Sequence, residues 1–105
     1  MALRRSINRN IASEKVNVMF YEVIEHGGKR MLKPLKMNTM VSLKLVRAIA
    51  DSTVVPTFYD TLSRNLQDRG IKTGTKVQLR AKFSDSHEML DPVLKGVRTL
   101  CEIVV

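Results

Sequence analysis

The 105-residue chain carries 18 Lys and Arg against 10 Asp and Glu, a net charge of +8 that favours polyanionic partners. Its hydrophobic content of 44%, with six methionines and no tryptophan, predicts one domain with an aliphatic, methionine-rich core. A membrane span of about 18 apolar residues is absent, and the single cysteine excludes an internal disulfide, so membrane-spanning and disulfide-stapled classes are excluded.

The chain begins with a basic segment, residues 1–14, in which Arg4, Arg5 and Arg9 stand among Ser and Asn. Its apolar residues recur every four positions, which fits either a short amphipathic helix or a disordered arm. Such an arm suits contact with the phosphates of a nucleic acid. A plain solvated terminus fits the same composition.

Residues 15–24 alternate apolar and polar side chains and are predicted to form a strand. The turn at 25–28 contains two glycines, and residues 29–37 are expected to return as a second strand. Pro34 cannot donate to a strand ladder, so this second strand should lie at an edge or break there. Its basic side chains have two possible roles: to protect the sheet edge from aggregation, or to lie along a phosphate backbone. Edge protection is the preferred interpretation.

Two helices are predicted next. Residues 43–51 have a wide apolar face that includes Leu45 and Ile49, with Ser42 as N-cap. The second helix begins near Pro56, places Leu62 and Leu66 on one face and ends at Gly70.

A strand is expected at 75–83, because apolar and polar residues alternate there with a period of two. The segment 84–92 is predicted to be a polar turn. Residues 93–105 are predicted to form the last strand, with Gly96 at a bulge near its start. One face of that strand should carry Val97, Thr99, Cys101, Ile103 and Val105.

Catalytic chemistry is not indicated. His26 and His87 both fall in predicted turns without a ligand-spaced partner, which argues against a metal site. Cys101 lies in an apolar strand, where a thiol is usually a small buried hydrophobe. No acid, base and nucleophile assemble, so we expect no enzyme, no cofactor, no metal and no small-molecule substrate.

The order of these elements resembles the HU and integration-host-factor superfamily of DNA-binding proteins. SLKLVRAIADSTVVPTFYDTLSRNL is similar to its helix pair, and GTKVQLRAKF to the strand that follows. The flanking segments VNVMFYEVI, KRMLKPLKM, SDSHEMLDP and VLKGVRTLCEIVV resemble the HU-like proteins of Bacteroidetes. The resemblance covers about residues 16–105 and implies a dimeric helical body with basic strands.

The chain departs from this family in two respects that bear on DNA bending. The link from Phe83 to Val97 is too short for the long β-arm with its intercalating Arg-Asn-Pro tip. The glycine-phenylalanine signature is replaced by Arg80-Ala81-Lys82-Phe83. The resemblance therefore does not imply strong kinking of DNA by a prolyl wedge.

We therefore expect an α+β domain at 15–105, with a two-helix body on a small antiparallel sheet, an N-terminal strand hairpin and the basic arm at 1–14. The expected function is sequence-tolerant binding of double-stranded DNA, with RNA left open, by a homodimer in the cytoplasm or bacterial nucleoid. The alternative is a non-enzymatic structural or assembly subunit, for which a phage or mobile-element origin is considered. Membrane-surface binding is only weakly supported. Leu45, Ile49, Leu62 and Leu66 are the predicted dimer contacts. The predicted nucleic-acid contacts are Arg4, Arg5, Arg9, Lys76, Arg80, Lys82, Lys95 and Arg98.

Overall fold

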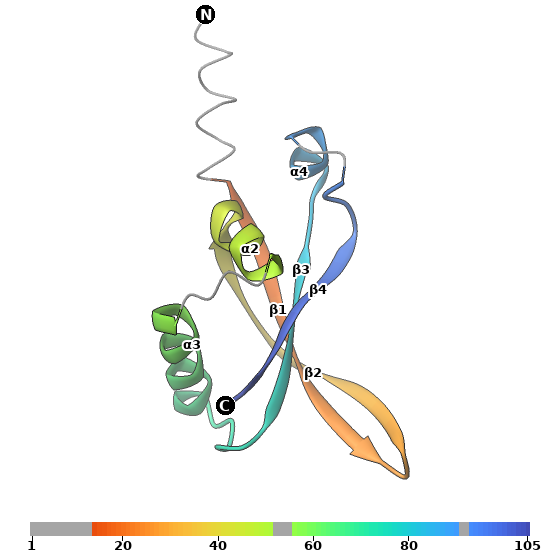
Figure 1. The fold of residues 1–105 in the computed structure, drawn as a ribbon, viewed down its shortest axis with the longest axis vertical. Helices are drawn as coiled ribbons and strands as arrows, with labels where there is room; N and C mark the ends of the chain where they lie inside the picture. The colour runs from red at the N-terminus through yellow and green to blue at the C-terminus, as the bar shows by residue number, and fades with distance from the viewer. Residues whose placement is uncertain (1–13, 52–55, 91–92) are drawn as a thin grey trace, which may run out of the picture.

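The computed structural model describes residues 14–51, 56–90 and 93–105 and confirms an α+β fold with an antiparallel sheet (Figure 1). The predicted arm, apart from Glu14, lies outside the described residues. The sheet has the strand order β2-β1-β3-β4. The elements in chain order are β1 (Lys15–His26), β2 (Lys29–Ser42), α2 (Leu43–Ala50), α3 (Pro56–Asp68), β3 (Lys76–Lys82), α4 (Asp85–Leu90) and β4 (Val97–Val104).

The first two strands form the expected hairpin, and its turn is closed by Gly27 and Gly28, both at positive φ. β2 is an edge strand, as Pro34 predicts, because a residue without an N–H is tolerated there. The strand continues to Ser42, five residues past the predicted end. Its pairing with β1 is interrupted just after Pro34, where Lys36 adopts a φ of 56°. After this irregularity β2 pairs with β1 again, from Asn38 onward, so the strand does not end at Pro34.

The last strand differs from its predicted pattern because it contains a bulge. Cys101 pairs with Leu79, but the next pair along is Thr99 with Arg80, so Leu100 is the extra residue. The prediction that five alternate residues share one face is therefore wrong. Val97 and Thr99 are on the face opposite Cys101, and the break is at Leu100, not near Gly96.

Both predicted helices form with the expected ends. The Ser42 hydroxyl accepts a hydrogen bond from the Leu45 N–H and caps α2. At the end of α3, Gly70 has a φ of 96° and its N–H donates to the Gln67 carbonyl. The Ile71 N–H donates to the Leu66 carbonyl, and these two bonds together make a Schellman motif.

One face of the sheet carries the core. Val77, Leu79 and Ala81 of β3 have no exposed surface, and they belong to one cluster with side chains from β1, α2 and α3. We call this the inner face. The opposite side of β3, with Lys76, Gln78, Arg80 and Lys82, is the outer face, and no described helix covers it. A sheet with one open face is normal for antiparallel strands, and it leaves the outer face available to a partner.

The segment predicted as a polar turn contains a short helix instead, α4, at the end of the sheet opposite the hairpin tip (Figure 1). The Ser84 carbonyl accepts bonds from the His87 and Glu88 N–H groups and starts the helix. His87, expected in an exposed turn, is 3% exposed. Its Nδ1 accepts from the Ser84 N–H at 2.9 Å, so Nε2 carries the proton and donates to the Lys15 carbonyl at 2.8 Å.

His87 thus joins α4 to the start of β1, and its removal should be costly. We expect His87→Ala to lower the free energy of unfolding by about 2 kcal/mol, because the Ser84 N–H and the Lys15 carbonyl both lose a buried partner. Met89→Ala in the same helix is the control, since Met89 is 86% exposed. Urea unfolding measures both, and equal values for the two variants would show that the His87 bonds contribute nothing.

Candidate nucleic-acid interface

Three of the predicted contact residues line the outer face of β3. Lys76, Arg80 and Lys82 alternate with inward-facing residues, as predicted, and Lys76 and Lys82 are exposed. At about 3.3 Å per residue, Lys76 and Lys82 are about 20 Å apart along the strand. That span matches several phosphates of a DNA strand.

A polar network occupies the outer face between these two lysines. The Gln78 side chain is 7% exposed, donates to Glu102 Oε2 at 3.0 Å and accepts from Arg80 Nε at 2.6 Å. The guanidinium of Arg80 lies over the Tyr21 ring, 5.2 Å from its centroid. Arg80 is therefore held in place by its neighbours, whereas Lys82 extends into solvent.

Two carboxylates reduce the positive charge of the outer face. Glu102 forms an ion pair with Arg30, and Glu25 lies 3.8 Å from the Lys76 amine. Both pairs are partly exposed, so each contributes little to stability. A phosphate that approaches Lys76 competes with Glu25 and weakens this pair. The outer face is basic, but less so than the strand sequence alone suggests.

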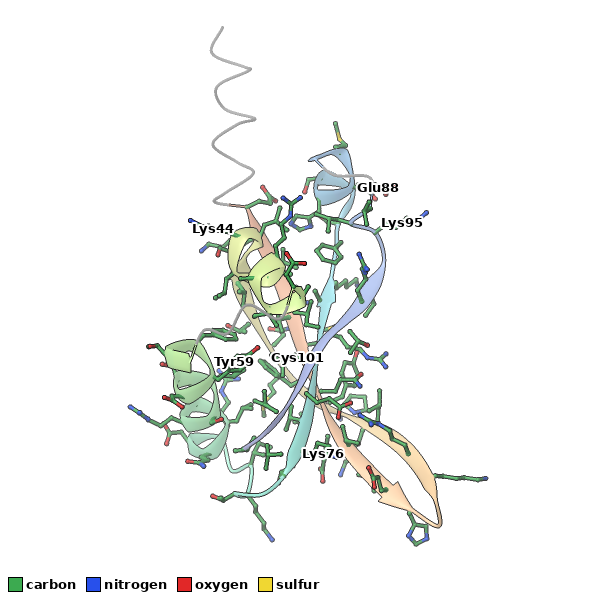
Figure 2. All side chains as sticks on the ribbon, in the orientation of Figure 1. Lys44, Tyr59, Lys76, Glu88, Lys95 and Cys101 are labelled. Atoms are coloured by element: carbon green, nitrogen blue, oxygen red, sulfur yellow. The ribbon has the colours of Figure 1, made fainter. Side chains whose placement is uncertain are left out.

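The structure does not bring all of the predicted contacts together. Arg4, Arg5 and Arg9 lie outside the described residues. Lys95 precedes β4 near α4, at the far end from Lys76 (Figure 2). Arg98 pairs with the inward-facing Ala81, so it is on the inner face, where it lines a hollow together with Asp51, the C-cap of α2. Of the predicted contacts that the structure describes, Lys76, Arg80 and Lys82 form one group, whereas Lys95 and Arg98 lie elsewhere.

A second basic group was not among the predicted contacts. β2 carries Lys29, Arg30, Lys33 and Lys36 without a single acidic residue, and all four are exposed. The sequence shows this group as a basic run with no acidic residue, a pattern that fits both edge protection and contact with a phosphate backbone. The choice between the two roles depends on where the hairpin lies relative to the outer face, which the sequence does not reveal.

Apolar side chains also reach solvent on the outer face. Val97 pairs with Lys82, Val104 with Lys76, and Met40 with Asn17, which places all three on that side. Their exposed fractions are 50%, 64% and 58%. The outer face is therefore a mixed surface, basic along β3 and apolar at its margins.

The predicted dimer contacts are mostly covered within one chain. Ile49, Leu62 and Leu66 are 3%, 6% and 2% exposed, whereas Leu45 is half-buried. Leu45 lines a hollow between α3 and β2 together with Phe58 and Met40. The homodimer stays a prediction, but a single chain already covers most of the wide apolar face that motivated it. A contact through this region must use Leu45 and its exposed neighbours.

Cys101 faces inward, as predicted, because it pairs with the fully buried Leu79. It is half-buried and lies next to Tyr59 of α3 (Figure 2). Burial raises the pKa of the Cys101 thiol, and a hydrogen bond with the Tyr59 hydroxyl lowers that pKa in part. The pKa of Tyr59 is also raised, mainly by burial and then by Cys101.

These shifts predict slow thiol chemistry. A raised pKa leaves less thiolate at a given pH, so Cys101 should react with iodoacetamide more slowly in folded than in urea-unfolded protein. Tyr59→Phe should slow the reaction further at alkaline pH, because the pKa of Cys101 rises when the hydroxyl is lost. Tyr21→Phe on the outer face is the control. Faster labelling of Tyr59→Phe would contradict the assigned hydrogen bond, provided that its unfolding curve is unchanged.

Other kinds of site are not apparent in the described part of the chain. It has no group of three or more His, Cys, Asp or Glu side chains that could hold a metal ion. Within the same residues no helix is both long and apolar enough to cross a membrane. No protein-family model matches the chain, and no curated protein or solved structure matches it significantly. The resemblance to the HU superfamily stays a prediction.

Proposed function

We propose that the protein binds double-stranded DNA with weak sequence preference through the outer face of its sheet. The observation that carries this proposal is the open face of β3, where Lys76, Arg80 and Lys82 stand in one row and no described helix covers them. Lysine and arginine contacts to phosphates supply affinity without sequence information. The proposal does not depend on membership of the HU superfamily or on a homodimer. Both are compatible with it and are tested separately.

The strength of binding follows from the number of phosphate contacts. Arg80 is held by Gln78 and Tyr21, and Lys76 is close to Glu25, so about two or three contacts per chain are expected from β3. Each contact contributes a slope of about −0.9 in log K against log salt. Affinity should therefore fall steeply between about 50 and 200 mM salt. Sequence should matter little.

A salt titration tests the proposal. Fluorescence anisotropy with two labelled duplexes of unrelated sequence should give similar affinities and the same salt slope for both. Single-stranded RNA of equal length serves as the comparison. If the protein binds this RNA more tightly than either duplex, RNA and not DNA is the ligand. If neither duplex binds at about 50 mM salt, the proposal fails.

The apolar margins of the outer face favour one other function. Val97, Val104 and Met40 are each at least half exposed, which suits burial against a protein partner. A structural or assembly subunit would use this surface, and its charge would serve solubility. This alternative predicts a salt-insensitive protein complex that is lost in Val97→Ser with Val104→Ser. If the protein does not bind duplex DNA, this structural or assembly role becomes the better explanation of the outer face.

A further inference from the structure

The β1–β2 hairpin extends past the rest of the sheet as a two-stranded ribbon (Figure 1). β1 pairs with β3 only over Asn17–Glu22, whereas its pairing with β2 continues to His26 and Lys29. We call residues 24–31 the hairpin tip. Its three residue pairs span about 10 Å at about 3.3 Å per residue.

The hairpin tip is narrow at its end. Gly27 and Gly28 have φ angles of 59° and 76°, which is the backbone that a two-residue hairpin turn requires, and they carry no side chains. Neighbouring strands are about 4.8 Å apart. A ribbon with its side chains therefore fits the major groove of B-DNA, which is about 12 Å wide and 8.5 Å deep, but not the minor groove of about 6 Å.

The two faces of the tip have different roles. Lys29, Met31 and Lys33 alternate along β2 and so share one face, and among the described residues neither lysine forms an ion pair. Met31 between them is 56% exposed. This face of the ribbon continues the inner side of the sheet, because Lys33 pairs with Glu22, whose partner on β3 is the inward-facing Val77. Past the edge of β3 no described element covers it, and both lysines are exposed.

The other face ties the tip to the sheet. Arg30 forms an ion pair with Glu102 of β4, and Glu25 lies 3.8 Å from the Lys76 amine of β3. The two pairs place this side of the ribbon beside the outer face, although each pair is partly exposed and contributes little to stability. Lys76 stands where the tip meets the basic row of β3.

We infer that the hairpin tip enters the major groove of duplex DNA, with Lys29 at the base edges and Lys33 at a phosphate on the groove rim. The inference rests on the proposed function and assigns a second contact to it. The lysine amine donates to guanine O6 and N7 on the groove floor. Because the end of the ribbon consists of glycines, readout at the tip is limited to Lys29 and its exposed cross-strand partner His26. Such a small number of side chains is in keeping with weak sequence preference.

A comparison of two duplexes tests which groove is used. One is unmodified, and in the other the cytosines carry glucosylated 5-hydroxymethyl groups that fill the major groove. The wild-type chain should bind the glucosylated duplex about tenfold more weakly. Netropsin, which fills the minor groove of A·T tracts, should leave its affinity unchanged. Equal affinity for the two duplexes would overturn the inference.

Two double variants with the same charge locate the contact. Lys29→Gln with Lys33→Gln should weaken binding to the unmodified duplex about tenfold and abolish the sensitivity to glucosylation. The salt slope should fall by about 0.9, because only Lys33 is assigned to a phosphate. The control is Lys44→Gln with Lys72→Gln, two exposed lysines of α2 and of the turn before β3. The control should retain the groove preference of the wild type.

The outcomes separate the two claims. Binding of both duplexes by the wild type, with equal losses in the two variants, refutes the hairpin contact and leaves the proposed function standing. Absence of any DNA binding at about 50 mM salt refutes the proposed function and the hairpin contact together. Circular dichroism spectra of both variants should match the wild type, because all four lysines are exposed.

Discussion

Lys76→Glu combined with Lys82→Glu should lower the affinity for duplex DNA about 100-fold at 50 mM salt. Both side chains are exposed on the outer face, so the change removes two phosphate contacts and adds two repulsive charges. The salt slope should become shallower by about 1.8, and every sequence should be affected alike. Fluorescence anisotropy over a salt series measures both quantities.

The double variant avoids Arg80 deliberately. A glutamate there would face Glu102 across the Gln78 side chain and would disturb the fold as well as the surface. The control is Arg64→Glu with Arg69→Glu, which changes the net charge equally on and just after α3, where both side chains are exposed. If this control loses as much affinity as the outer-face variant, the effect reflects net charge and the assigned surface is wrong.

Leu79→Ala should lower the free energy of unfolding by about 3 kcal/mol. Leu79 is fully buried on β3, which has a strand on either side, and its truncation leaves a cavity that the sheet cannot close. A domain of this size is expected to have a total stability of only about 5–10 kcal/mol, so this loss is large. Because the chain has no tryptophan, urea unfolding is best followed by circular dichroism.

Val104→Ala is the matched control for this prediction. It also shortens an aliphatic side chain in the sheet, but Val104 is 64% exposed on the outer face. Its expected loss is at most about 0.5 kcal/mol. Similar losses for Leu79→Ala and Val104→Ala would mean that the assignment of inner and outer faces is incorrect.

The elements that could be predicted are those with a strong local signal. The period-two alternation of β3, the two-glycine turn at 27–28, the Ser42 cap and the Gly70 end are each set by residues next to one another in sequence. Pro34 limited β2 to an edge position or a break, and β2 is an edge strand whose pairing is irregular just after Pro34. The location of three basic residues on one strand face followed directly from this alternation.

The features that could not be predicted depend on contacts between distant residues. The partner of His87, the Lys15 carbonyl, lies 72 positions away, so neither its burial nor the α4 helix was visible locally. The bulge at Leu100 has no compositional signature. Because of it, the Arg98 side chain is on the inner face of the sheet, whereas Arg80 is on the outer face. In the same way, the two carboxylates that oppose the basic row come from the hairpin and from β4.

The most direct test of the DNA-binding surface is an NMR titration of the isotope-labelled chain with a short duplex. We expect the largest shifts in the amide signals of Lys76–Lys82 and of the hairpin tip. Smaller shifts are expected in outer-face residues of β1, and none along the exposed side of α3. Shifts centred on α3, or no shifts at low salt with saturating duplex, would contradict the assignment of the outer face as the DNA-binding surface.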